Sequence, residues 1–527
     1  MFHSYVPNLM KSPRILFAIS AGTLLCVAAV PRDSGKNVLV HPKATPTFAK
    51  DIAPIIYSKC APCHHAGEVA PFTLTSYDDA RDKAPTIVAA IKSKYMPPWQ
   101  AISHGEFKNE RTLTSAQIEA IEAWSSAGAP QGDMTQAPKA PTYTPGWSMG
   151  TPDLVAKPAQ PYTVSAEGAD EYRCFVIPTN YPEGRFVTDV EVKPGNRNVV
   201  HHVLVYLDTS GVARNKDGKD GKPGYASFGG PGFIPAGSLG GWAPGLQAQS
   251  LPKGDGMWLP KGADIVIQVH YHKNGKPETD LSQIGVRFAK NPVDKRIRWE
   301  SVDNEFIKIL PGDAHYEVTA SMDLKAPITL LDVIPHMHLL GHDMTVTATL
   351  PNGTKRELIH VEPYDFNWQT RYTYKEPVHL PTGTHLALVA HYDNSSANPH
   401  NPNNPPKKVT FGEQTTNEMC FAFFTYTFEG EHLTKGIHVG DENGLEGAGR
   451  TLTVDKIFDH YDADHDGFLD ASELVDVVDF FQSVMGDPSK KPQDPNLAAH
   501  YLISLYGKEQ KGKLSRSEFT TMTKAFK

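Results

Sequence analysis

The segment NVVHHVLVYL, residues 198–207, is rich in β-branched and other apolar residues and is a clear strand signal. Segments of the same kind occur at RFVTDVEV (185–192), ADIVIQVHYH (263–272) and DMTVTATL (343–350). Asn352-Gly353 then leads into KRELIHV, which is typical of a β-hairpin. Strand patterning extends from residue 162 to 435 and is interrupted at 212–258 by a Gly-rich stretch, interpreted as a surface excursion. A region of this length predicts two β-sandwiches rather than one.

The composition indicates a globular chain of several domains. Its 527 residues are 40% hydrophobic, enough for several cores, and 21% charged, which excludes wholesale disorder. The formal net charge of -8 disfavours a nucleic-acid partner. Outside the N-terminal apolar run and the motif described below, the cysteines are Cys174 and Cys420, too few for a disulfide-stapled scaffold. Whether these two pair stays open.

The first thirty residues predict export. Lys11 and Arg14 precede the apolar run 15–30, and Ala28 and Ala29 offer a cleavage site for a signal peptide, residues 1–30. An uncleaved anchor is the alternative. The protein is therefore expected in the periplasm or otherwise exported, with no membrane span after signal removal.

A Cys-x-x-Cys-His motif predicts one covalent heme c. Cys60 and Cys63 would form the thioethers and His64 would ligate the iron, with a zinc half-site as the alternative. Helical patterns flank the motif at 46–58 and 113–127, where Ser115 is a candidate cap.

The sixth iron ligand is predicted to be Met96, in YMPPW. A thioether ligand raises the heme potential and suits electron transfer, and His65 and His104 are the competing candidates. Residues 44–131 resemble a small, all-α class I cytochrome c domain, and residues 132–161 form a Pro-rich linker.

Three histidine clusters fall on predicted strands. His336 and His338 share one strand face, because residues i and i+2 point the same way. The adjacent His201 and His202 point to opposite faces of a regular strand, so they can share a metal only if the strand is bulged or twisted there. The third cluster is His270-Tyr-His272. Imidazoles with a thioether favour copper.

The motifs VVHHVLVY, IQVHYH, PHMHLLG and TTNEMCFAF resemble those of the copper type II, ascorbate-dependent monooxygenases. This resemblance covers about residues 160–430. It implies two all-β, jelly-roll-like sandwich domains, at 162–310 and 311–435, each holding one copper ion and facing each other across an open solvent cleft. The implied reaction hydroxylates a C–H bond with O2, and the second oxygen atom leaves as water.

The resemblance also implies the copper ligands. An electron-transfer copper would be bound by His201, His202 and His270, and a catalytic, oxygen-binding copper by His336, His338 and Met419. Ascorbate is the usual reductant of the family, but the fused heme suggests that electrons arrive through it. An external reductant or electron-donor protein is therefore a possible partner beside the small-molecule substrate and O2.

The C-terminal region, residues 451–527, predicts an all-α EF-hand pair after a Gly-rich linker at 436–450. The loop DADHDGFLDASE places oxygen ligands at the calcium-binding positions. These ligands are Asp462, Asp464, Asp466, Phe468 through its carbonyl, Asp470 and Glu473. A second loop, 507–518, has Gly507 and Lys511 where carboxylates are needed, so one calcium ion is expected.

A rival function belongs to another class: a non-enzymatic electron-transfer or copper-handling protein that keeps this fold. Met419 disfavours it, because copper storage needs no separate oxygen-type site.

Overall fold

The computed structural model describes residues 45–68, 70–143, 146–227, 230–244, 246, 248–440, 454–485 and 493–525. The predicted signal peptide and most of the linker at 436–450 lie outside these residues. Pro46–Lys527 form one unit by their mutual contacts. None of the described helices combines the length and apolar character that crossing a bilayer requires.

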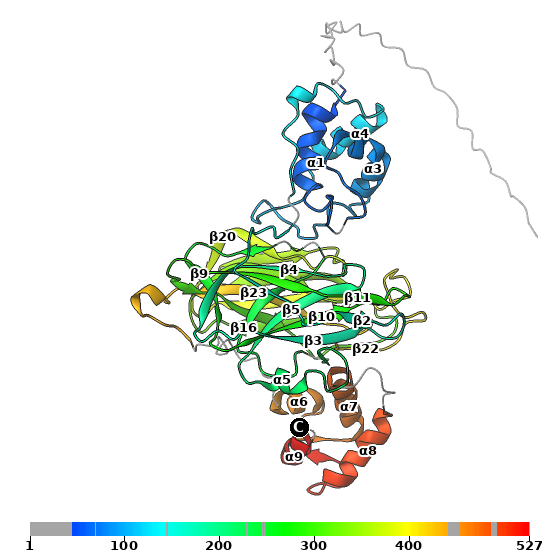
Figure 1. The fold of residues 1–527 in the computed structure, drawn as a ribbon. Coiled ribbons are helices and arrows are strands. Elements are labelled where there is room, and N and C mark those ends of the chain that lie inside the picture. The colour runs from blue at the N-terminus through cyan, green and yellow to red at the C-terminus, as the bar shows by residue number, and fades with distance from the viewer. Residues whose placement is uncertain are drawn as a thin grey trace, which may run out of the picture. The chain divides into compact units, whose positions relative to one another are not determined.

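The N-terminal helices lie together as one group (Figure 1). They are η1 (Phe48–Ile52), α1 (Ala53–Lys59), α2 (Tyr77–Asp82), α3 (Ala84–Lys92) and α4 (Ser115–Ser126), followed by the short η2 (Met134–Gln136). Phe48, Ile56 and Trp124 are fully buried between them. The predicted helix at 113–127 is confirmed, but Thr114 rather than Ser115 is its cap: the Thr114 hydroxyl accepts from the Gln117 N–H at 3.2 Å.

The first pair of sheets lies between residues 154 and 296. One sheet has the order β1 (Leu154–Ala156), β12 (Gln283–Phe288), β4 (Arg185–Lys193), β9 (Asp255–Leu259) and β13 (Lys295–Arg296), with β8 (Gln249–Ser250) also paired to β4. The other has the order β6 (Tyr225–Ala226), β3 (Glu171–Pro178), β10 (Asp264–Tyr271), β5 (Val200–Asp208) and β7 (Ser238–Trp242). A small sheet pairs β2 (Tyr162–Val164) with β11 (Glu278–Asp280), and α5 spans Val212–Lys216. Val190, Val205 and Ile267 from both large sheets share one core, as in a sandwich.

The stretch at 212–258, predicted to be a surface excursion, is partly integral to these sheets. Its strands β7 and β9 bury Leu239, Met257 and Leu259 almost completely. The prediction was wrong there because the many glycines hide the alternation of a strand while still allowing pairing.

The second pair of sheets begins at Arg298, before the predicted boundary at residue 311. One sheet has the order β14 (Arg298–Asp303), β23 (Phe421–Phe428), β17 (Ile328–His336) and β20 (Tyr372–Leu380). The other has the order β16 (Tyr316–Asp323), β21 (His385–Tyr392), β18 (Gly341–Thr349) and β19 (Lys355–Val361). A short pair joins β15 (Lys308–Ile309) to β22 (Val409–Thr410), and η3 spans Leu433–Lys435. Val333, Val346 and Leu388 lie in the core between the two larger sheets.

A connecting segment, residues 99–108, attaches to the second pair of sheets. Ala101 bridges to Val361 and Phe107 bridges to Tyr374 in antiparallel fashion. The Phe107 side chain is fully buried in the core of these sheets. The chain just after Met96 is therefore anchored on the second sandwich.

The C-terminal residues form a helical group (Figure 1). Its elements are α6 (Val454–Tyr461), β24 (Phe468–Leu469), α7 (Ala471–Met485), α8 (Pro495–Tyr506), β25 (Leu514–Ser515) and α9 (Arg516–Ala525). Strands β24 and β25 pair antiparallel and so join the two predicted calcium-type loops.

Candidate functional site

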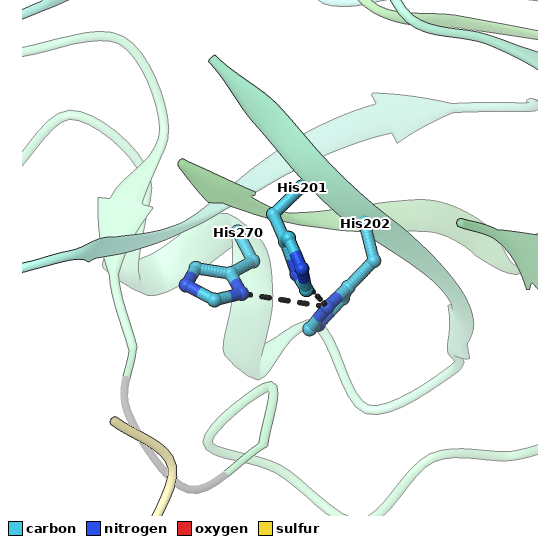
Figure 2. A group of neighbouring side chains, drawn as sticks. All are labelled: His201, His202 and His270. Atoms are coloured by element: carbon cyan, nitrogen blue, oxygen red, sulfur yellow. Dashed lines mark hydrogen bonds between the residues drawn. The ribbon is translucent and has the colours of Figure 1, made fainter. Parts of the chain in front are cut away.

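The bulge that two adjacent histidines need is present in β5. Strand β10 pairs His270 with His202 and Tyr271 with Val200, so His201 is an extra residue without a counterpart. The bulge turns the rings of His201 and His202 toward the same side, where they meet His270 (Figure 2).

The three imidazoles converge through their Nδ1 atoms. The Nδ1 of His202 lies 3.3 Å from that of His201 and 3.4 Å from that of His270. Each ring offers one nitrogen within 4.8 Å of the others. Since neutral imidazoles carry one lone pair each, three converging nitrogens form a ready ligand set for one metal ion.

Asp170 fixes the orientation of His270. Its carboxylate lies 2.9 Å from the Nε2 of His270 and 3.0 Å from the Nδ1 of the exposed His272. Thr415 donates a longer hydrogen bond, 3.3 Å, to the same carboxylate. With the His270 proton held on Nε2, the lone pair of Nδ1 faces the other two histidines.

The environment keeps these histidines neutral. Burial, reinforced by the neighbouring His270, lowers the pKa of His201 to about 3 and holds the pKa of His202 well below its usual value. Burial also lowers the pKa of His270, although the hydrogen bond that His270 donates to Asp170 opposes this shift. Burial alone would raise the pKa of Asp170, but its bonds to His270 and His272 hold it below its usual value. Neutral imidazoles are the form that ligates metals.

His336 and His338 form a second pair at the end of β17. Their ring centroids lie 5.3 Å apart, and both side chains are buried. The Nδ1 of His336 lies 3.0 Å from Gln369 Oε1, and the Nδ1 of His338 lies 3.2 Å from the Asn417 carbonyl. Because these acceptors hold the Nδ1 protons, the Nε2 lone pairs stay free. Burial lowers the pKa of His336 to about 4 and holds that of His338 well below its usual value.

Glu418 ties Met419 to the His338 loop. The buried Glu418 carboxyl accepts from the backbone N–H of His338 at 2.8 Å, of Leu340 at 2.6 Å and of Met419 at 3.3 Å. Tyr392 donates to the Met419 carbonyl at 2.7 Å. Met419 is 8% exposed, so its thioether is available only to groups inside the protein.

Phe366 lies between the two histidine groups. Its ring stacks on His201 with centroids 4.6 Å apart and meets His338 edge-on at 5.5 Å. The resemblance implies an open solvent cleft between the metal sites. In this structure a single aromatic ring contacts a histidine of each group.

A cavity of about 250 Å³ contains the side chains of the heme motif. Cys60, Cys63, His64 and Met96 all line it, whereas the competing His65 stacks on Tyr143 at a centroid distance of 3.7 Å and does not line it. His104 does not line it either. The Nδ1 of His64 lies 3.1 Å from the Phe72 carbonyl, which leaves its Nε2 free.

The first calcium-type loop brings three carboxylates together. Asp462, Asp464 and Glu473 each offer an oxygen within 4.8 Å of the others. Lys513, from the second loop, forms an ion pair with Asp466. In the second loop, Glu518 accepts backbone N–H bonds from Lys508, Glu509 and Ser515.

The two isolated cysteines do not pair. Cys174 and Cys420 are both buried as free thiols, one on β3 and one beside β23.

Sequence patterns missed the residues that orient the ligands. Asp170 is 100 residues from His270, and Gln369 is 33 residues from His336, so no local motif links them. Phe366 lies in an irregular segment without periodicity.

Comparison with known proteins gives a specific match. Residues 308–438 match the family described as Copper type II ascorbate-dependent monooxygenase, C-terminal domain. The chain is 23% identical to DBH-like monooxygenase protein 1 of Gallus gallus over 278 residues. The aligned region covers 48% of this chain and 43% of that protein. The chain thus spans less than half of the length of this relative.

Solved structures give only weak likenesses. The cowpea mosaic virus top component is 9% identical, covers 52% of this chain and 89% of its own, and has a TM-score of 0.23. PNGase F, a glycosylasparaginase from Flavobacterium meningosepticum, is 10% identical, covers 52% of this chain and 95% of its own, and also has a TM-score of 0.23. Scores this low support no assignment.

Proposed function

Because residues 308–438 match the C-terminal domain of the copper type II ascorbate-dependent monooxygenases and part of the chain is similar to a DBH-like monooxygenase, we propose that this chain is an exported dicopper monooxygenase that hydroxylates a C–H bond of a small substrate. Electrons reach its copper sites through a heme bound by its own N-terminal helices. The observation that carries this proposal is the pair of neutral histidine groups with Phe366 between them.

The ligand sets of the two groups differ in a way that suits two copper sites. His201, His202 and His270 present Nδ1 atoms, whereas His336 and His338 leave their Nε2 atoms free. The thioether of Met419 would complete the second set, because the neighbouring Glu418 accepts a backbone hydrogen bond from His338. Copper bound there would supply one-electron cycling and oxygen activation. A thioether favours the reduced ion, so we assign the oxygen-binding role to the Met419 side.

The protein residues have three tasks in this reaction. Asp170, Gln369 and the Asn417 carbonyl hold the imidazole protons, so that the lone pairs stay on the metal side. Burial keeps the histidines unprotonated at neutral pH. Phe366 excludes water from the space that it fills between the two groups.

The heme part of the proposal rests on the cavity at the Cys-x-x-Cys-His motif. Two thiols, one imidazole and one thioether line a single cavity, so Cys60 and Cys63 would hold a c-type heme through thioethers and His64 and Met96 would ligate its iron. The heme would supply one-electron storage beside the copper sites.

The calcium part of the proposal is a structural ion. Asp462, Asp464 and Glu473 would hold it. The second loop stays empty, because Gly507 and Lys511 stand where carboxylates are needed.

The enzyme proposal is tested by oxygen uptake. Copper-loaded protein with ascorbate as reductant should consume O2, and Met419→Ala should abolish this while leaving copper at the His201 group. Met344→Ala is the matched control, because it also removes a fully buried methionine from the second sandwich. Equal O2 uptake in wild type and Met419→Ala would instead favour a copper-handling protein.

A further inference from the structure

One short segment of the second sandwich, residues 366–369, contacts all three candidate redox sites. Phe366 stacks on His201 of the first histidine group. Trp368 lines the cavity of the heme motif. Gln369 is hydrogen-bonded to His336 of the second group at 3.0 Å.

The segment is held in place by the chain that follows Met96. The Gln100 side chain donates to the Asp365 carbonyl at 2.8 Å, and the Trp368 N–H donates to the same carbonyl at 3.0 Å. The connecting segment 99–108 therefore joins the heme cavity to this segment through a hydrogen bond.

Trp368 presents an unused donor at the cavity. Its Nε1 is buried and has no hydrogen-bond partner among the residues that the structure describes. The Nε of Arg111, a second residue lining the same cavity, is also buried without a partner in the described part of the chain. A buried donor without an acceptor is destabilising, because its hydrogen bonds to water are lost and not replaced. The carboxylates of a heme would satisfy both donors.

Two other contacts connect the heme motif or the segment to the first histidine group, and both are less direct. Phe366 reaches His201 only through ring stacking, and it lies two residues before Trp368. Arg197, which lies four residues before His201, forms an ion pair with Glu68 at 3.0 Å. By contrast, Gln369 is the chain neighbour of Trp368 and is hydrogen-bonded directly to a copper-ligand candidate.

We propose that Trp368 couples the heme to the His336–His338 site through Gln369, so that electrons enter the copper pair at His336 rather than at the His201 group. This rests on the proposed function of heme and copper. Each event moves one electron: ferrous heme becomes ferric and one cupric ion becomes cuprous, with no bond made or broken. Trp368 and Gln369 are positioning residues in this transfer.

The test is stopped-flow oxidation of the heme in full-length protein, with heme reduced and copper oxidised at matched copper content. Trp368→Leu and Gln369→Leu should each slow heme oxidation about tenfold or more, a factor that corresponds to ~1.4 kcal/mol of barrier. Gln369→Glu keeps the acceptor for His336 and should retain most of the rate. Trp368→Phe keeps an aromatic ring at this position but removes the Nε1–H donor. This variant should also shift the heme midpoint potential.

One control variant interrupts a competing contact. Arg197→Ala removes the ion pair with Glu68 and should oxidise heme at near the wild-type rate. Loss of heme oxidation in this control, or an unchanged rate in both leucine variants, would overturn the entry route while leaving heme supply intact. If the wild-type heme is not oxidised by copper at all, the heme part of the proposed function fails, and the entry route fails with it.

Discussion

Replacing Asp170 with asparagine should weaken copper binding at the His201 group without removing any ligand. The carboxylate accepts from two imidazoles, at 2.9 Å from His270 and 3.0 Å from His272. An amide keeps one acceptor oxygen and adds two donors, so it competes with the Nε2–H of His270 instead of holding it. Outer hydrogen bonds of this kind are typically worth 10- to 100-fold in metal affinity. We therefore expect a loss of ~1.4–2.7 kcal/mol at this site alone.

The measurement is a competition titration of Cu(I) against a chelator of known affinity. Thr415→Val is the matched control, because it removes the 3.3 Å bond to the same carboxylate but leaves the His270 contact. It should change affinity less than twofold. An Asp170→Asn affinity within twofold of wild type would refute the reasoning, as would a loss that falls on the His336 group.

Three further perturbations have defined outcomes. Burial raises the pKa of Asp255 to about 6 in the folded protein, so the folded state loses stability as pH rises from the unfolded pKa of this carboxyl through about 6. Asp255→Asn should therefore stabilise the protein by ~1 kcal/mol at pH 7, well under the unscreened ~3 kcal/mol, and by almost nothing at pH 4. Calorimetry at the two pH values measures this difference. Glu473→Gln should abolish calcium binding by titration calorimetry and leave copper content unchanged, and two ions per wild-type chain would contradict the reading of the second loop. Cys63→Ser should leave heme attached through one thioether at most, as measured by acid–acetone extraction followed by mass spectrometry of the polypeptide. Heme still attached through two thioethers would contradict the heme assignment.

The sequence predicts the strands that carry the ligands, because the apolar and β-branched residues that indicate a strand lie within the strand itself. It also predicts the condition for His201 and His202 to act together, and β5 meets that condition with a bulge opposite Tyr271 and His270. The bulge itself follows from pairing with β10, which no single-strand pattern contains.

The residues that orient and connect the sites depend on tertiary contacts. Asp170, Phe366 and Gln369 lie in segments without regular periodicity, and their partners are far away in sequence. The start of the second sandwich at Arg298 was also hidden, because β14 is defined by pairing with β23 near the other end of the domain.

The central claim is that two buried imidazole groups hold two copper ions and that one of them also has a thioether ligand. X-ray absorption at the copper edge, on protein loaded with Cu(I), tests it most directly. We expect two ions per chain, with ligation by the five histidines of the two groups plus one sulfur, and loss of the sulfur signal in Met419→Ala. A single retained copper ion, or a wild-type spectrum without sulfur, would contradict it.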